Sequence, residues 1–379
     1  MLMNVFYKRL IVPVCVMLGL LACINSAQAT AVKNLLDSEV VVPDQSAHHR
    51  QQALQKAFSD VLVRYSGTVS VLRDPSIKAA IKTPSRYLNQ YQYTTGVNAR
   101  GDNEIILQAD FQAKPLKALL NAKQLPIWSD SRPNIVVWIV VDDNTGRNIV
   151  SNSNNVAVAE IVMNEAKRRG LPLTLPTYDM TDLQTVDSSD VWALDVNKIS
   201  AASLRYDADA LLIGRVVALA NGGWQSNWQL IDGNIEVPFS SEGKDLSTLL
   251  QPIIDSSAET LSTKYAVISG SGNAEMLQIS VAQIDSFTKY TDALLYLRNL
   301  GAVKSVTPSK IDHGQVVFSL KINADTEKLW QAIALNNHLV QRAPPAPIHQ
   351  VPADTSTSNS SPAPTLEPIR YFDWQGQKY

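Results

Sequence analysis

The adjacent carboxylates Asp142 and Asp143 are the residues whose type and position could best support catalysis. They follow the apolar run 135–141, which predicts a buried strand, and ligand sites of α/β sheets form beyond the carboxyl ends of such strands. Two carboxylates there could bind a divalent cation or act as acid and base. An Asp-rich turn that only ends the strand is the alternative we favour, because Asp is common in turns.

Other catalytic signatures are absent from the sequence or too short to be specific. No G-x-S-x-G elbow, phosphate-binding loop, dinucleotide fingerprint or H-E-x-x-H motif occurs. Two S-x-x-K matches, at Ser241 and Ser286, lack the motifs that accompany them in acyltransferases. No metal-ligand spacing on an expected helix connects the five histidines, which are His48, His49, His313, His338 and His349. We therefore expect no catalytic residue, no metal site, no cofactor and no enzymatic activity.

Two tryptophans could stack on a ligand. Trp224 and Trp228 lie four residues apart in the segment 224–230, which we expect to be a strand, so they share one face. Indole rings on one face could stack on a sugar ring. Packing of both rings beneath a helix is the alternative we favour.

A third aromatic group lies near the end of the sequence, at Tyr371, Phe372 and Trp374. It follows a segment rich in Pro, Ser and Thr, and residues 341–379 hold seven of the 19 prolines, a composition typical of a disordered tail. Because Tyr and Trp are favoured interface anchors, these three residues are candidate contacts for a partner protein. The alternative we favour is that they fold back onto the protein's own surface or have no role.

The first 29 residues have the pattern of a secretory signal peptide. Lys8 and Arg9 precede the apolar run 10–24, and an Ala-x-Ala site predicts cleavage after Ala29. The run is too short for a membrane span, and Pro13 interrupts it. We therefore expect a periplasmic protein.

The two cysteines, Cys15 and Cys23, both lie in this segment. Cleavage after Ala29 would leave a chain without thiols, which excludes disulfides, zinc–thiolate sites and Cys nucleophiles. The segment Leu20–Cys23 also resembles a lipobox. A membrane-anchored lipoprotein, acylated at Cys23, is therefore the alternative, and membrane association is expected only in that case.

Hydrophobic periodicity predicts an α+β chain of three small mixed units in series. We expect an α+β unit over 30–126, a mixed-sheet unit over 132–266, a ferredoxin-like β-α-β-β-α unit over 274–340 and a disordered tail over 341–379. The charged fraction of 18% and hydrophobic fraction of 45% are typical of globular proteins. A net charge of −2 argues against nucleic-acid binding, because no basic excess could neutralise phosphates.

Several stretches together resemble a known family. Residues 53–67, 84–93, 209–216 and 290–300 are similar to a bacterial envelope family called domain of unknown function 2066. This resemblance implies an exported Gram-negative protein without an assigned activity. The stretch Asp209–Val216 also resembles the N-terminal domain of TolB and related envelope proteins, which implies that the middle unit acts by contacting partners.

These observations favour a non-catalytic periplasmic adaptor or accessory protein of the Gram-negative cell envelope, with an unidentified envelope protein as partner. The alternative is a protein that binds a small molecule or cell-wall glycan through Trp224 and Trp228. A metal-dependent enzyme that uses Asp142 and Asp143 is the third possibility.

Overall fold

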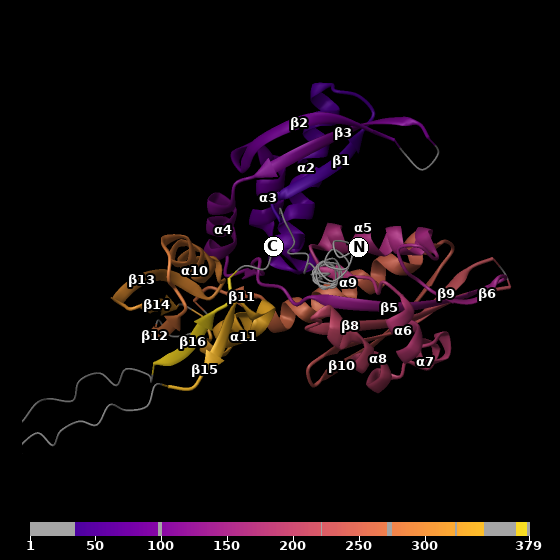
Figure 1. Ribbon diagram of the computed structural model, residues 1–379. Coiled ribbons are helices and arrows are strands. Elements are labelled where there is room, and N and C mark those ends of the chain that lie inside the picture. Colours follow the sequence, from indigo (N-terminus) through magenta and orange to yellow (C-terminus); the bar gives the residue numbers. More distant parts are fainter. Residues whose placement is uncertain are drawn as a thin grey trace, which may run out of the picture.

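The computed structural model describes residues 35–97, 101–220, 222–270, 275–322, 324–344 and 369–376. It shows the expected α+β chain of three units, coloured indigo to purple, magenta to orange, and orange to yellow in Figure 1. The expected signal peptide, with Cys15 and Cys23, lies outside the described residues. Within the described ranges, no helix is both long and apolar enough to cross a membrane.

The first unit packs helices against a three-stranded antiparallel sheet of order β1-β3-β2. Helix α2 begins where the Ser46 side chain accepts a hydrogen bond from the His49 amide, and it ends at Gly67, which has φ +81°. Phe58, Val61 and Leu62 of α2 are fully buried in the core of this unit. Its elements are β1 Asp37–Val42, α2 Ala47–Ser66, η2 Val69–Arg73, α3 Pro75–Lys82, η3 Pro84–Arg86, β2 Leu88–Val97, β3 Asn103–Phe111 and α4 Ala113–Ala122.

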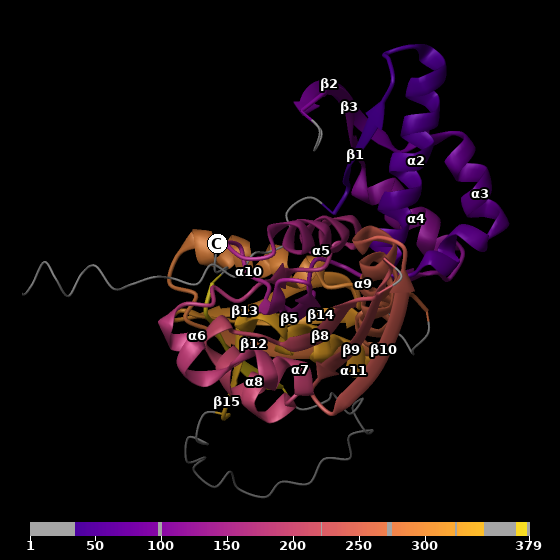
Figure 2. The same cartoon turned by 90° about the vertical axis from the view of Figure 1, so that its right-hand side faces the viewer.

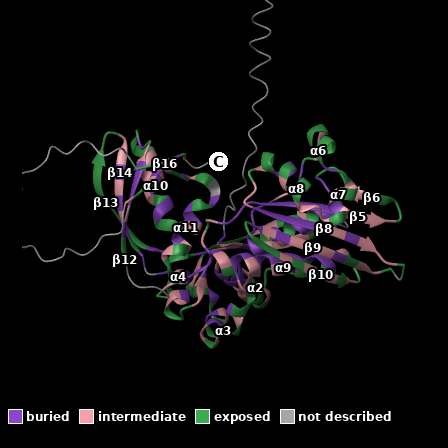
Figure 3. Cartoon of the chain, turned by 90° about the horizontal axis from the view of Figure 1, so that it is seen from below, coloured by how far each residue is buried: buried purple, intermediate pink, exposed green. Residues whose placement is uncertain are grey.

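The middle unit is built on a mixed sheet of order β10-β9-β8-β5-β6, with β7 also pairing β5. Strands β5 and β8 run parallel at its centre and are buried (Figure 3). Helices α5 and α9 cover one face and α6 to α8 lie on the other (Figures 1 and 2). Its elements are β5 Ile135–Asp143, β6 Gly146–Ile149, α5 Val156–Arg169, β7 Leu173–Thr174, α6 Met180–Thr185, α7 Ser188–Ala193, α8 Val196–Ser203, η4 Leu204–Tyr206, β8 Ala210–Ala218, β9 Trp224–Asp232, β10 Ile235–Gly243 and α9 Leu246–Tyr265.

The continuous apolar run in β5 is explained by these two helical layers. Val137 and Ile139 belong to the core beneath α5 and α9, whereas Val136 and Trp138 belong to the core beneath α7 and α8. Because both faces of β5 are buried, neither alternate set of residues can be polar.

The third unit has the expected β-α-β-β-α order, but its sheet contains two further strands, β15 and β16. The sheet order is β13-β14-β12-β16-β15. In a ferredoxin-like fold the strand after the second helix completes the sheet. Here a strand from the far end of the sequence, β16, separates β15 from β12. The elements are β12 Glu275–Ala282, α10 Phe287–Asn299, β13 Val303–Asp312, β14 Gln315–Ile322, α11 Thr326–Ala334, η5 Leu335–Asn337, β15 Leu339–Arg342 and β16 Arg370–Trp374.

Strand β16 lies inside the region that we expected to be a disordered tail. Its alternate residues Phe372 and Trp374 are 3% and 2% exposed, so the strand has a clear apolar face. The proline-rich composition, averaged over residues 341–379, concealed this five-residue strand. Residues 345–368 and 377–379 of the same region lie outside the description.

The units are joined by a buried arginine and a short two-stranded sheet. β4 (Pro126–Ile127) pairs with β11 (Val267–Ile268). Between the first two units, the guanidinium of Arg132 donates hydrogen bonds to five carbonyl oxygens, those of Arg64, Trp128, Ser129, Arg169 and Gly170. Arg132 therefore binds the carboxyl ends of both α2 and α5, where a cation is favoured by the helix dipole.

Candidate functional site

Asp142 and Asp143 are both engaged in the β5–β6 hairpin. Asp142 Oδ2 accepts hydrogen bonds from Arg147, 2.9 Å from Nη2 and 3.3 Å from Nε. Asp143 Oδ1 accepts from the amide and hydroxyl of Thr145, at 2.8 and 2.6 Å, and these bonds lower the pKa of Asp143 below its ordinary value. The arrangement is that of an Asp-rich turn. In the described part of the chain, no group of three or more His, Cys, Asp or Glu side chains could hold a metal ion.

Trp224 and Trp228 point to one face of β9, but only Trp224 is accessible. Trp228 is 1% exposed and belongs to the core beneath α5 and α9. Its indole lies against Gly214 of β8, where an added Cβ would come within 2.2 Å of the ring. Trp228 is therefore a core residue and cannot stack on a ligand, because the neighbouring strand and the helices occupy the space around its ring.

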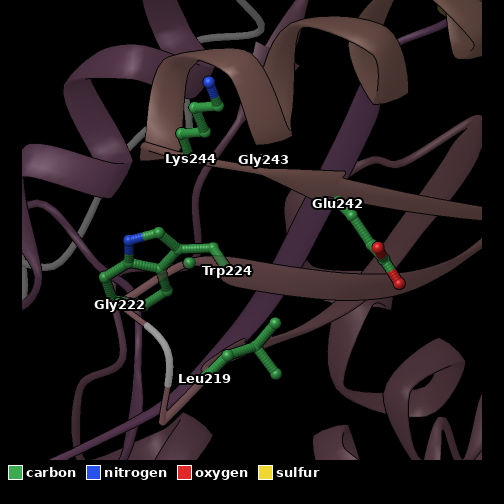
Figure 4. Close-up of a pocket in the computed structure, with 7 residues that line it drawn as sticks. Leu219, Gly222, Trp224, Glu242, Gly243 and Lys244 are labelled. Atoms are coloured by element: carbon green, nitrogen blue, oxygen red, sulfur yellow. The ribbon is translucent and has the colours of Figure 1, made fainter.

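Trp224 lines an open cavity of about 490 Å³ where β9 begins and β10 ends, at the open end of their hairpin. Leu219, Glu242 and Lys244 line it with Trp224, together with the glycines at 222, 223 and 243. Figure 4 shows the carboxylate of Glu242 and the ammonium of Lys244 pointing away from the indole. Ligand sites usually combine an apolar surface with convergent polar groups. This cavity offers a stacking surface without that convergence.

The structure places the three C-terminal aromatic residues in a sheet rather than on a free segment. Phe372 and Trp374 point into the core of the third unit and are not available as surface contacts for a partner. Tyr371 points to the opposite face and is half-buried, with the guanidinium of Arg342 5.8 Å from the ring centre. The interpretation of Phe372 and Trp374 as exposed partner contacts is therefore corrected, because each ring has a place between the sheet and its helices.

We call the gap between β12 and β15, which β16 fills, the strand slot. β16 runs parallel to β12, from the pair Ile279–Arg370 to the pair Ala282–Asp373. On its other side it runs antiparallel to β15, from Leu339–Trp374 to Arg342–Tyr371. Backbone pairing with a sheet edge is one way in which proteins bind extended peptides, and β16 pairs in this manner on both of its sides.

Side chains of the slot recognise the helix-facing residues of β16. Trp330 of α11 stacks on Phe372, with ring centres 6.3 Å apart and planes inclined at 19°, and Arg370 lies 4.0 Å above the Trp330 ring. Tyr296 of α10 lies 5.8 Å from Trp374. Trp330 and Tyr296 thus contact two aromatic side chains that lie two residues apart on β16.

The end and outer face of the strand are also held by polar contacts. The amide of Gln375 donates to the carbonyl oxygen of His338 at 3.0 Å, and Nδ1 of His338 lies 3.0 Å from the carbonyl oxygen of Gly376. On the outer face, Asp373 pairs with Arg342 at 3.5 Å. The slot thus selects by backbone pairing, by aromatic fit and by charge.

A buried polar cluster in the middle unit was not foreseen from the sequence. Asp182 is fully buried and accepts hydrogen bonds from the Tyr206 hydroxyl at 2.5 Å, the Tyr178 amide at 2.8 Å and Arg205 at 3.1 Å. Burial, with the hydrogen bond to Asp182, raises the pKa of Tyr206. Because Asp182 receives three donors, the cluster is a satisfied link between α6 and η4. No local motif reveals it, since Arg205 and Tyr206 lie more than 20 residues after Asp182 in the sequence.

Comparison with known proteins corrects the family assignment. Residues 29–129 match a family model described as a domain of unknown function, DUF8605. This is a different family from the domain of unknown function 2066, so that assignment is wrong. The comparisons also show no similarity between Asp209–Val216 and the TolB N-terminal domain. No curated protein matches the chain significantly. The family match thus covers the first unit and the residues that flank it on both sides, and a family of unknown function assigns no activity.

Proposed function

We propose that the chain is an exported, non-catalytic adaptor of the Gram-negative cell envelope that binds an extended protein segment in the strand slot. The observation that supports this function is the insertion of β16 between β12 and β15. Both edges of the slot pair with a strand that is remote in sequence, and the rings of Trp330 and Tyr296 contact its two buried aromatic side chains. Export is supported by the sequence of residues 1–29 alone.

Photo-crosslinking in living cells tests the binding site. A photoreactive amino acid replaces Val340 on β15, which is 41% exposed and pairs with Asp373 of β16. The same amino acid at Ile311 is the matched control, because Ile311 is 67% exposed on β13, at the opposite edge of the sheet. The proposal expects a discrete protein adduct at position 340 and none at 311. Equal adducts at both positions, or none at either, would contradict it.

Export has its own measurement. The intact mass of the protein purified from the cell envelope should correspond to a chain that begins at Thr30. A mass that includes an acylated Cys23 would show the lipoprotein form instead. A chain that retains Met1 in the cytoplasm would overturn the envelope location.

Glycan binding at Trp224 is the second candidate function, and the open cavity beside this ring favours it. If the cavity binds cell-wall glycan, the protein should pellet with purified sacculus and Trp224→Ala should remove the pelleting. Trp192→Ala is the matched control for a general loss of aromatic contacts. Arg147 and Arg215 already flank the Trp192 ring, with their guanidinium carbons 3.7 and 5.6 Å from the ring centre. Failure of the unaltered protein to pellet would eliminate this candidate.

A further inference from the structure

The connection between β15 and β16 is far longer than their geometry requires. The two strands are antiparallel neighbours, and Arg342 at the end of β15 pairs with Tyr371 near the start of β16. A hairpin loop of about two to five residues joins such strands. This chain instead places residues 343–369, 27 residues in all, between them.

A connection of this length makes the binding of β16 in the slot of its own chain less favourable. The effective concentration of a tethered segment falls roughly as the −3/2 power of the tether length. A connection of 27 residues therefore gives about an 18-fold lower effective concentration than one of about four residues. The same 27 residues could extend over about 90 Å, which is enough to reach a neighbouring molecule.

The contacts that hold β16 do not depend on this connection. Its backbone pairs with β12 and β15, and its side chains contact Tyr296, Trp330 and Arg342. Every one of these groups belongs to the third unit. A copy of β16 that entered from another molecule would make the same backbone pairing, the same aromatic contacts and the same ion pair.

We propose that the strand slot binds the Arg370–Trp374 strand of a second copy of this chain, and that two copies exchange these strands. The inference rests on the proposed function of the slot as a strand-binding site, and it names the partner. Reciprocal exchange fills both slots and gives a closed two-fold dimer. The second copy is the favoured occupant because its Arg370–Trp374 segment can make each of the contacts observed in the slot.

Single cysteines in separate copies test the exchange. Residues 30–379 contain no cysteine, so a Val340→Cys copy and an Asp373→Cys copy each carry one thiol. These positions pair across β15 and β16, where a disulfide can form. The two copies carry tags of different size and are incubated together at about 1 mM, which is the range of effective concentrations for flexible tethers. Exchange predicts a disulfide between the two copies on a non-reducing gel.

Two controls make the result specific. Val340→Cys mixed with Ile311→Cys measures random collisions, because Ile311 lies at the other edge of the sheet. Deletion of residues 344–364 leaves six connecting residues, which raises the effective concentration within one chain about tenfold. This deletion should lower the yield of mixed disulfide by about the same factor.

The outcomes separate this inference from the proposed function. A mixed-disulfide yield equal to that of the Ile311 control overturns the exchange, provided that one chain carrying both Val340→Cys and Asp373→Cys forms its internal disulfide. The photo-crosslink at position 340 to a different protein would then leave the adaptor function standing. Absence of the internal disulfide as well would show that β16 does not lie beside β15, and both proposals would fail.

Discussion

The strand slot predicts an unusual response when its two buried aromatic side chains are removed. Phe372 and Trp374 are 3% and 2% exposed, and truncation of a core Phe or Trp to Ala costs about 3–5 kcal/mol. If both were ordinary core residues with independent effects, the double substitution would lower the free energy of unfolding by about 6–10 kcal/mol. A loss of that size would leave little of the 5–15 kcal/mol that is typical of a domain.

We expect the two effects not to add, because β16 can leave the sheet while the β-α-β-β-α framework stays folded. The total loss is then limited to the free energy with which β16 docks. Each single substitution should lower the free energy of unfolding by about 3 kcal/mol, and the double substitution by little more. The coupling energy between the two sites should therefore be about 2–3 kcal/mol.

Urea unfolding of the single and double variants measures this coupling. Phe318→Ala is the matched control, because Phe318 is fully buried on β14, which belongs to the framework itself. Its effect should add to that of Trp374→Ala, since the framework must unfold whether or not β16 is docked. Additive losses for Phe372→Ala and Trp374→Ala would show that β16 is an inseparable part of the core, and would refute the reasoning about the slot.

Three further predictions concern the parts that hold the middle unit together. Arg132→Met removes the donor to five carbonyl oxygens and should lower the free energy of unfolding by at least about 3 kcal/mol, measured by thermal unfolding; an unchanged melting temperature would contradict the role of Arg132 as a junction. Gly214→Ala places a Cβ 2.2 Å from the Trp228 ring and should cost about 1–3 kcal/mol in urea unfolding, whereas a neutral effect would mean that the ring can move. Burial raises the pKa of Asp209 above its ordinary value of 3.8, so the stability that this group contributes is present at low pH and lost as pH rises through the raised pKa. Asp209→Asn should therefore stabilise the protein more at pH 7 than at pH 4, and a larger gain at pH 4 would reverse the assigned sign.

Local patterns were enough to predict much of the fold. The continuous apolar run in β5 required burial on both faces, and the alternation of helix and strand after Glu275 predicted the framework of the third unit. The role of Arg132 could not be predicted in this way. It stands in a polar stretch between two units, and its five acceptors are backbone carbonyls that only the folded chain brings together.

The candidate sites show a similar division. The turn around Asp142 and Asp143 was foreseen, because its hydrogen bonds are made within five residues. The spacing of Trp224 and Trp228 correctly placed both rings on one face, but it could not show that Gly214 admits one of them into the core. Exposure depends on the neighbouring strand, which a pattern along one strand does not contain.

The C-terminal strand shows why composition and periodicity must be weighed over different lengths. Over residues 341–379 the proline and serine content predicts disorder, yet Phe372 and Trp374 alternate with Tyr371 and Asp373 in the two-residue period of a half-buried strand. That short pattern indicates that the segment can pair with a sheet edge. The long connection before it allows this edge to belong to another molecule. Such a strand is held by its contacts in the slot rather than by its covalent connection to β15. Whether it binds its own chain or a second copy therefore depends on the effective concentration that the connection gives it, compared with the concentration of the protein.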